Sequence, residues 1–525
     1  MTELELRLPP KLAHDDAACR SAAADKLGIS LDDISDFHVI RRSLDARGRA
    51  AVFQLRVAVY THNTLFTPEP ALLSAFKNVA DAPPVLIVGA GPAGYFAALE
   101  LIEQGLKPII FERGKDVRAR RYDLKAIQQE GTVNPHSNYC FGEGGAGTYS
   151  DGKLYTRSHK RGSIEKILKL LVEHGSKSDI LIEAHPHIGS NKLPQVVQNI
   201  RETIEKHGGE VHFDSFVTDF ILKNNKIIGL TVNHKNEHFG NAVIVATGHS
   251  ARDIYYLLHE KGVRMEAKPF ALGVRIEHQQ QWVDAIQYKT PQRDPLLPAA
   301  AYSLVSQVNG RGVFSFCMCP GGLVVPASTS PGEIVVNGMS MSRRDSAYAN
   351  SGTVVAIELE DLKGFEKYGV FAALEFQKSV EQSMFAESNG TQRAPAQRLT
   401  DFVNRRISRD LPPTSYIPGL ISAPLHQILP PSVFQRLQAG IREFDTMMRG
   451  YMTENANVIG TESRTSAPVR IPRDAVTLMH PDVVALYPCG EGAGYAGGII
   501  SAAMDGQNVA KAIGKSAANW RCLRR

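Results

Sequence analysis

The sequence predicts an α/β fold in which a nucleotide-binding domain is interrupted by a second domain and preceded by a small module. Three observations predict it. A strand, a glycine-rich turn and a helix follow one another at 85–106. Two more buried strands with small residues at their ends come at 242–248 and 486–498, and residues 1–80 have a strand and helix pattern of their own. Strand, glycine turn and helix form the basic unit of a Rossmann-type sheet. We therefore expect an N-terminal module at 1–80, a nucleotide-binding domain at 84–264 and 453–525, and an inserted mixed α+β substrate domain at 265–452.

The N-terminal module is expected to have β-α-β-β order. Residues 3–8, 34–43 and 50–60 alternate apolar and polar side chains as strands do, and residues 15–27 have helical spacing. The module carries several arginines that would attract an anionic partner, namely Arg41, Arg42, Arg47 and Arg49. Charged hairpins usually face water, and this simpler interpretation is favoured.

The turn at residues 89–94 has the spacing of a dinucleotide-binding fingerprint. Gly89 permits a tight turn, Gly91 lets the backbone approach a pyrophosphate, and Gly94 lets the helix pack closely on the strand. The first N–H groups of the helix then face the phosphate charge. The predicted contacts are Gly89, Ala90, Gly91, Pro92, Ala93 and Gly94.

The next strand, residues 108–111, ends in an acid, Glu112, about 20 residues after the turn. A carboxylate at this place accepts hydrogen bonds from the ribose hydroxyls of an adenosine. An acid rather than an arginine disfavours a 2′-phosphate on that ribose. Glu112 and the Arg113 that follows it are both predicted cofactor contacts.

A second glycine-rich stretch, residues 139–153, is expected to bring backbone N–H groups close to an anionic or carbonyl oxygen. The alternative is a flexible surface loop. The predicted contacts in this stretch are Gly144, Gly145, Gly147, Thr148, Ser150, Asp151, Gly152 and Lys153.

Two later segments are expected to complete the same site. A β-meander at 211–232, with a turn at Asn224-Asn225, leads into the buried strand 242–245, and another strand begins at Leu486. This order is that of flavoprotein nucleotide domains, where a helix N-terminus stabilises negative charge on the reduced flavin. The predicted contacts are Ala246, Thr247, Gly248, Gly490, Glu491, Gly497, Gly498 and Ile499.

Candidate catalytic groups lie outside these glycine-rich segments. His187 follows His185 by two residues, so both would face one side of an extended segment and suit acid–base work, although a packed or solvated histidine is the simpler interpretation. No metal site is expected, because no further ligands stand at suitable spacing. Arg464 and Arg470 would bind a carboxylate-bearing substrate, and internal salt bridges are an equal alternative.

Cys317 and Cys319 would face the same way on a strand. A disulfide or a persulfide site is one interpretation of this pair. A strand end followed by a Pro-Gly-Gly turn needs no such chemistry, and the pair is not the C-x-x-C of dithiol reductases.

The composition is that of a globular protein of two or three domains. The chain has 525 residues, 43% apolar residues and a net charge of +5. This charge is small for the length and does not indicate nucleic-acid binding. The N-terminus lacks the pattern of a secretory signal, six cysteines form no secreted disulfide framework, and the longest apolar run is interrupted by glycines, so we expect a cytoplasmic protein without a membrane span.

The glycine turn, the Ala-Thr-Gly strand and the Gly-acid strand together resemble the FAD-binding domain of the glutathione-reductase-like flavoprotein superfamily. The detailed strings resemble the bacterial family of FAD-dependent dehydrogenases or FAD-dependent proteins, over nearly the whole chain. These strings are residues 43–47, 141–154, 317–322, 462–470 and 489–499. The resemblance implies bound FAD and a redox role. One departure is Glu491, because the superfamily usually has aspartate in this motif, so Gly490 and Gly492 are expected to do more of the holding.

A second nucleotide fingerprint is missing after residue 150, which argues against a pyridine-nucleotide disulfide reductase. The remaining architecture is similar to that of para-hydroxybenzoate hydroxylase, in which NAD(P)H binds only transiently. We expect an FAD-dependent oxidoreductase that transfers a hydride between flavin N5 and a small-molecule substrate, for which an anionic compound is one alternative. Lys153 is expected to stabilise the reduced ring. The alternatives are an NAD(P)H-dependent flavin monooxygenase and an RNA-modifying or RNA-binding flavoprotein, which the small net charge disfavours.

Overall fold

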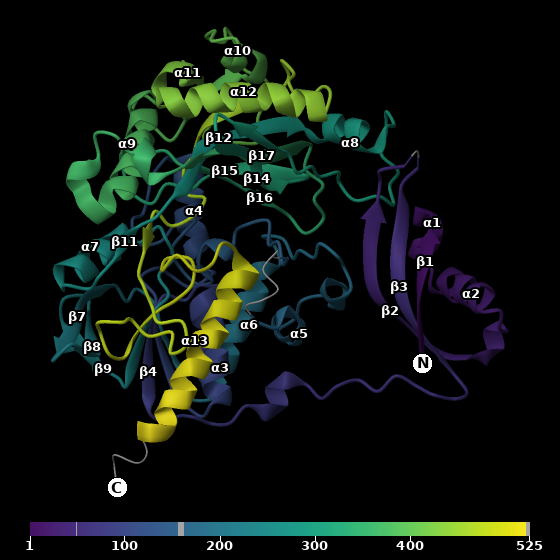
Figure 1. The fold of residues 1–525 in the computed structure, drawn as a ribbon, viewed down its shortest axis with the longest axis horizontal. Helices are drawn as coiled ribbons and strands as arrows, with labels where there is room; N and C mark the ends of the chain where they lie inside the picture. Colours follow the sequence, from purple (N-terminus) through teal and green to yellow (C-terminus); the bar gives the residue numbers. More distant parts are fainter. Residues whose placement is uncertain (49, 156–161, 521–525) are drawn as a thin grey trace.

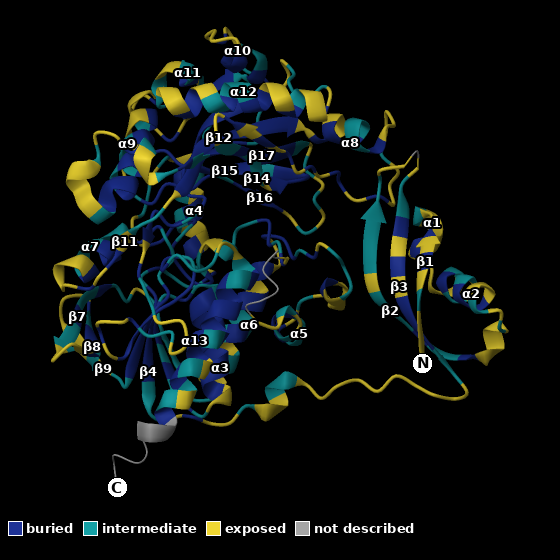
Figure 2. Cartoon of the chain, viewed as in Figure 1, coloured by how far each residue is buried: buried dark blue, intermediate teal, exposed yellow. Residues whose placement is uncertain are grey.

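The computed structural model describes residues 1–48, 50–155 and 162–520. Figure 1 shows an N-terminal module on the right, a nucleotide-binding domain at the lower left and an inserted domain at the top. The segment that joins the module to the nucleotide-binding domain is extended, and residues 62–71 are all exposed (Figure 2). The two larger parts, in contrast, pack against each other and enclose buried residues between them (Figure 2).

The N-terminal module has the expected β-α-β-β order. Its antiparallel sheet has the strand order β1-β3-β2, and the Asp15 carboxylate caps the main helix by accepting a hydrogen bond from the Ala17 N–H at 2.9 Å. Ala23 and Ala24 of that helix are buried. The elements are β1 (Thr2–Leu8), α1 (Pro10–Ala13), α2 (Asp16–Leu27), β2 (Ile34–Asp45) and β3 (Val52–Thr61).

Two of the module's arginines bind carboxylates of this chain. Arg42 Nε lies 2.7 Å from Glu183 of the nucleotide-binding domain, and Arg47 Nε lies 2.9 Å from Asp45. Arg49 falls outside the described residues. Arg42 therefore holds the module to its neighbour, and these pairs give no support to an anionic partner.

The nucleotide-binding domain contains a five-stranded parallel sheet in the order β22-β10-β4-β5-β6. Nearly continuous apolar runs build its inner strands because both faces are covered by other elements. The strands are β4 (Pro84–Val88), β5 (Lys107–Phe111), β6 (Glu210–His212), β10 (Ala242–Val245) and β22 (Leu486–Pro488). The helices are α3 (Pro92–Glu103), α4 (Arg120–Gln129), α5 (Ile164–Glu173), α6 (Leu193–Lys206), α7 (Arg252–Glu260) and α13 (Ile499–Trp520).

The predicted β-meander is present, but its start was placed wrongly. Residues 211–217 do not form one strand, because β6 ends at His212 and joins the parallel sheet, and Asp214 has a left-handed φ of 50°. The meander itself is β7 (Val217–Lys223), β8 (Lys226–Val232) and β9 (Asn236–Phe239). The predicted turn holds, since Asn224 and Asn225 have φ values of 51° and 57°.

The inserted domain is built on a seven-stranded mixed sheet in the order β13-β14-β17-β12-β20-β18-β19. Helix α12 packs closely on it, because a Cβ at Gly440 would lie 2.6 Å from Val313 of β14. One strand, β20, comes after the expected boundary at residue 452, so the chain returns to the nucleotide-binding domain only after Glu462.

The sheet strands are β12 (Phe270–Gln279), β13 (Val305–Val308), β14 (Arg311–Cys319), β17 (Tyr348–Ile357), β18 (Ala394–Arg398), β19 (Leu420–Ser422) and β20 (Asn457–Glu462). Two ribbons accompany the sheet, β11 (Glu266–Ala267) with β21 (Val469–Arg470) and β15 (Gly322–Pro326) with β16 (Val336–Ser340). The helices are α8 (Gln280–Tyr288), α9 (Ala372–Ala386), α10 (Leu399–Val403), α11 (Leu425–Ile428) and α12 (Pro431–Met447). None of the helices in the described ranges has the length and apolar character that crossing a membrane requires.

Candidate functional site

A cavity lies between the nucleotide-binding domain and the inserted domain. One side is formed by the ends of β4, β5 and β10, the glycine-rich loop 145–153 and the start of α13. The other side is formed by β14, β16 and β20 of the inserted domain and by the residues that follow β20. Chain segments far apart in the sequence thus meet around one space.

The glycine turn after β4 has the geometry that the sequence predicts. A Cβ at Gly94 would lie 2.0 Å from the carbonyl oxygen of Gly89, so only glycine lets α3 approach the strand this closely. Gly89 itself has a left-handed φ of 105°. Gly91 is different, because a Cβ there would have only the Cα of Gly145, 4.0 Å away, as a neighbour. Its side of the turn is therefore open to the cavity.

Glu112 lines the cavity and also holds its walls together. Its carboxylate accepts hydrogen bonds from the N–H groups of Ala90, Gly114 and Gly142, at 2.9, 3.0 and 2.9 Å. Within the described part of the chain, Oε2 accepts the bond from Ala90 alone, so it keeps capacity for a hydrogen bond from a ribose hydroxyl. The supporting role was not predicted from the sequence.

Arg113, at the same end of the cavity, is fixed by its neighbours. Its guanidinium lies over the rings of Phe141 and Phe216, at 4.5 and 4.7 Å from their centres, and forms an ion pair with Asp253. These contacts fix the position of the guanidinium at the cavity lining, where its positive charge suits a phosphate.

Arg120 shapes the second glycine-rich stretch, and no sequence pattern singles it out. Its fully buried guanidinium donates hydrogen bonds to the carbonyl oxygens of Asn138, Glu143 and Gly145, at 2.8, 2.8 and 2.9 Å. The stretch is therefore an ordered loop, and the alternative of a flexible surface loop is wrong.

Most of the predicted cofactor contacts do line the cavity. They are Gly89, Gly91, Pro92, Ala93, Glu112, Arg113, Gly145, Gly147, Ser150, Asp151, Gly152, Lys153, Ala246, Thr247, Gly248, Glu491, Gly497, Gly498 and Ile499. Five others lie behind the lining and support it instead. The Ala90 N–H binds Glu112, Gly94 packs on Gly89, Gly144 packs on Thr148, Thr148 binds the Glu143 carbonyl, and the Gly490 N–H binds Asp505.

Of the predicted catalytic groups, Lys153 is the one that lines the cavity and is available to interact with a ligand there. Its ammonium donates a hydrogen bond to the Met318 carbonyl. Burial lowers the pKa of this ammonium, but the neighbouring thiols of Cys317 and Cys319 and the Asp151 carboxylate outweigh burial and raise it. Lys153 therefore carries a positive charge into the cavity at neutral pH.

His187 does not line the cavity. It pairs with Lys153 through a backbone bridge, and its Nε2 lies 3.2 Å from the Ser342 carbonyl. Burial lowers the pKa of the imidazole, and Arg344 lowers it further. The simpler interpretation of a packed histidine holds, because the ring contacts the protein rather than the cavity.

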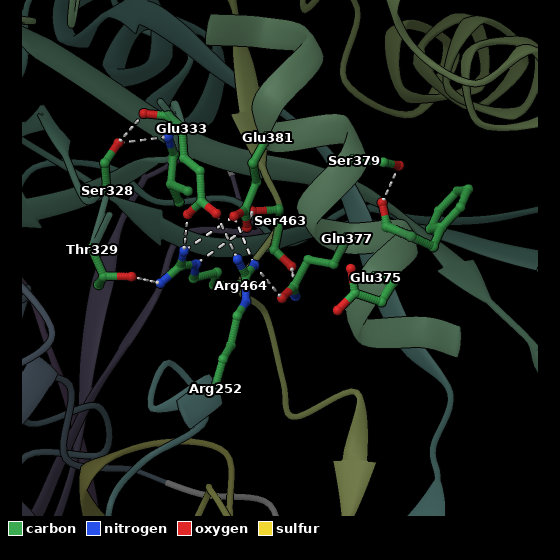
Figure 3. Close-up of polar contacts among 12 residues, drawn as sticks. Arg252, Ser328, Thr329, Glu333, Glu375, Gln377, Ser379, Glu381, Ser463 and Arg464 are labelled. Carbon is green, nitrogen blue, oxygen red and sulfur yellow. Dashed lines mark hydrogen bonds and ion pairs between the residues drawn. The ribbon is translucent and has the colours of Figure 1, made fainter. Parts of the chain in front are cut away.

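Arg464 lines the cavity but is not free to bind a substrate (Figure 3). Its guanidinium lies 3.1 Å from Glu333 and 3.1 Å from Glu381, and it donates a hydrogen bond to the Thr329 hydroxyl. Glu381 also binds Arg252 of α7 at 2.7 Å. The expectation of a substrate anchor is therefore corrected: Arg464 is part of a buried ion-pair cluster that joins the two domains.

Arg470 is likewise not a cavity residue. It is exposed at the end of β21, and its guanidinium lies 5.1 Å from the centre of the Tyr495 ring. Neither Arg464 nor Arg470 is therefore placed to bind the carboxylate of a substrate in the cavity.

The inserted domain contributes a buried pair that sequence reasoning missed. Arg275 is fully buried, its Nε lies 2.8 Å from Glu462, and its other nitrogens bind Asn350 and Asn337. Burial raises the pKa of Glu462 to about 6, and the Arg275 guanidinium opposes this shift. An arginine inside the apolar run 270–277 was the available signal for this pair.

The residues of the cavity fit FAD. The glycine turn is open at Gly91, the helix N-termini of α3 and α13 both begin at lining residues, and a Cβ at Gly497 or Gly498 would meet no atom within 4 Å. Helix N-termini favour phosphate and other negative charge. Two such termini, an acid for the ribose and open glycine backbone are what a dinucleotide with an anionic reduced ring requires.

Comparison with known proteins agrees with this fit. Residues 269–465 match the family described as FAD-dependent protein, C-terminal domain-like, residues 84–121 match an FAD binding domain, and residues 1–60 match a domain of unknown function. Over 510 residues the chain is 42% identical to an uncharacterized protein of Clostridium beijerinckii, a match that covers 93% of this chain and 94% of that protein.

Solved structures show only distant similarity. The flavin-dependent brominase Bmp2 is 14% identical, with 83% of this chain and 79% of that chain covered and a TM-score of 0.37. A geranylgeranyl bacteriochlorophyll reductase-like protein from Thermoplasma acidophilum is 14% identical, with 84% and 79% covered and a TM-score of 0.34.

Proposed function

This chain belongs to the family of FAD-dependent proteins, and on that premise we propose that it is an oxidoreductase whose FAD exchanges a hydride, at flavin N5, with a small-molecule substrate. A nicotinamide coenzyme that binds transiently is the proposed electron donor. The observation that carries the proposal is the cavity itself: one side is open glycine backbone suited to a dinucleotide, and the other side belongs to a separate domain.

Bound FAD supplies the two-electron chemistry, and this chain's residues position it and adjust its charge. The first turn of α3 binds the pyrophosphate, and the Glu112 carboxylate accepts hydrogen bonds from the ribose hydroxyls. The start of α13 at Ile499 and the Lys153 ammonium stabilise negative charge on the reduced ring. Apolar side chains on the inserted side, among them Phe316 and Val336, exclude water from the cavity.

The substrate is proposed to be small, because it shares the space between two domains with the cofactor. The ion pairs of Arg464 and the exposed position of Arg470 remove the support for an anionic substrate. Of the four predicted catalytic groups, Lys153 is the cation that remains available at the lining.

Anaerobic mixing of the purified yellow protein with NADH or NADPH tests this function. We expect one of the two coenzymes to bleach the visible flavin absorbance. Reduced protein that then meets oxygen and returns directly to the oxidised spectrum supports a dehydrogenase or reductase, whereas a transient absorbance before that return supports the monooxygenase alternative. A protein that retains no flavin, or whose flavin neither coenzyme reduces, contradicts the proposal.

A further inference from the structure

Cys317 and Cys319 end strand β14 at the wall of the cavity. Cys317 is exposed and lines the cavity, whereas Cys319 is completely buried beside it. Both belong to the inserted domain, whose side of the cavity faces the glycine turn that holds the dinucleotide. The proposed function assigns no role to either cysteine.

A β-bulge sets the positions of these two cysteines. Phe316 pairs with Gly352 and Cys319 pairs with Asn350, so β14 contains one residue more than its partner strand between the two pairs. Cys317 has a left-handed φ of 47°, which is strained for a residue with a side chain. Strain and bulges of this kind occur next to active sites, where they redirect a side chain.

The Cys319 thiol contacts the residue that carries the other thiol. It donates a hydrogen bond to the Cys317 carbonyl at 3.3 Å. One residue separates the two cysteines on the bulged strand, so forming a bond between their sulfurs involves only a short stretch of backbone.

The surrounding charges favour a thiolate at Cys317. The hydrogen bond from Cys319 lowers the pKa of Cys317, and the nearby cations Lys153 and Arg275 lower it further, against the effect of desolvation by the surrounding cavity wall. Two anions are also close, but Asp151 binds Arg344 and Ser340, and Glu462 binds Arg275. The same hydrogen bond and burial raise the pKa of Cys319, so that this thiol keeps its proton.

We propose that Cys317 and Cys319 form a redox-active pair that exchanges two electrons with the FAD bound in this cavity. The proposal rests on the proposed function, and it adds a second redox centre to the same site. In the oxidising direction the Cys317 thiolate and the Cys319 thiol form one S–S bond, and the S–H bond of Cys319 breaks. The two electrons and that one proton pass to the oxidised flavin, which becomes the anionic two-electron-reduced form. The reverse step regenerates the thiolate and the thiol.

The first test counts thiols and does not depend on activity. Apo and FAD-loaded protein are treated with the disulfide-forming reagent diamide or with a reductant. The protein is then alkylated and digested, and the peptide masses are measured by mass spectrometry. We expect the oxidised peptide that spans Cys317 and Cys319 to lose two hydrogens and to escape alkylation at both sites. Cys140 is the matched control, because it also lines the cavity. Cys140→Ser should leave the result unchanged, and a Cys317 that pairs with Cys140, or that stays alkylated after oxidation, overturns the proposal.

The second test counts electrons. Anaerobic reductive titration of the oxidised, FAD-loaded protein should consume four electron equivalents in the parent and in Cys140→Ser, but two in Cys317→Ser and in Cys319→Ser. A parent protein that contains full FAD and consumes two equivalents overturns the redox pair while the proposed function stands. A protein that retains no FAD overturns the proposed function and the electron exchange together, and the thiol count then reports whether the disulfide forms without the cofactor.

A third measurement separates positioning from structure. Lys153→Met should move the midpoint of the pH dependence of Cys317 alkylation upward, because it removes a cation beside the thiolate. Lys153→Arg should restore most of the parent midpoint. Equal midpoints in the parent and in Lys153→Met contradict the role of Lys153 in maintaining the thiolate.

Discussion

The two domains that enclose the cavity contribute to it in different ways. The nucleotide-binding domain presents open glycine backbone, as at Gly89 and Gly91, together with charged side chains that face the cavity. The inserted domain presents mainly apolar side chains, and its lining carboxylate, Glu462, is buried with a partner, as is Arg464 just after it. Open glycine backbone and helix N-termini bind the phosphate groups of FAD, and these are the same whatever substrate the protein acts on. Buried side chains determine stability, proton binding and chemistry. Substitutions on the two sides should therefore be distinguishable by what they change.

The largest effect is expected from Arg464→Met. Removing this guanidinium leaves the buried carboxylates of Glu333 and Glu381 with Arg252 as their shared cation, and breaking a buried ion pair costs about 3–5 kcal/mol of unfolding free energy. Urea unfolding measures this loss. The control is Arg406→Met, whose guanidinium is largely exposed and pairs with Asp401, and which should cost under about 1 kcal/mol. Equal losses in the two variants would contradict the buried cluster.

The pH response gives a second test of the inserted domain. His278 of β12 is 2% exposed, and burial lowers its pKa to about 4, while its Nε2 lies 2.8 Å from the Tyr451 carbonyl. Since the pKa in the folded state is below the unfolded value of about 6.5, the unfolded state binds more protons between these values and stability falls as the pH falls.

This single group should lower the unfolding free energy by about 3 kcal/mol between pH 6.5 and pH 4. His278→Gln keeps a donor for the Tyr451 carbonyl but cannot titrate, so its stability should depend less on pH over this interval. Unfolding curves at several pH values measure the difference, and parallel curves for parent and variant would show that His278 is not responsible.

The nucleotide-binding side should respond in cofactor affinity instead. In Gly91→Val the new side chain has open space beside Gly145 and an ordinary φ, so the fold should persist, but the methyl groups enter the pyrophosphate position. We expect FAD affinity to fall by about 1–3 kcal/mol, roughly 5- to 150-fold in Kd. Equilibrium dialysis measures it. Gly312→Val is the control, because Gly312 does not line the cavity although its strand, β14, ends there. Full FAD retention in Gly91→Val would refute the glycine cradle.

The smallest effect is expected from Arg470→Ala. The exposed guanidinium loses its contact with the Tyr495 ring, which is worth about 0.5–1 kcal/mol at a surface site. Thermal unfolding and substrate kinetics should both stay close to those of the parent. A large rise in KM without loss of stability would restore Arg470 as a substrate anchor.

The sequence was sufficient to predict the glycine turns of the site. It was insufficient to predict the partners of its buried charged side chains. Gly89 and Gly94 could be interpreted one by one, because a short local spacing fixes a turn and a close approach. The partners of Arg464 lie 131 and 83 residues away along the chain, so no local pattern reveals that its charge is already used.

The same reason explains the errors in the fold. Alternation continued from Val211 to Val217 although the backbone turns at Asp214, and the strand pairing that decides the sheet is formed with β5, about 100 residues earlier. The bulge at Cys317 could not be predicted either, because no residue type in the sequence indicates a left-handed backbone at a position other than glycine. What local spacing encodes was predicted, and what depends on distant partners was not.

The order of the strands in the parallel sheet has a consequence for synthesis on the ribosome. Strand β22 and helix α13 close the sheet beside β10 and α3, yet they are translated about 250 residues after β10, which takes roughly 10–50 s at usual elongation rates. During that time the edge of β10 has no partner, and the cavity lacks the start of α13. The nascent chain therefore cannot load its cofactor completely before residue 499 has left the exit tunnel, and the inserted domain has time to fold first.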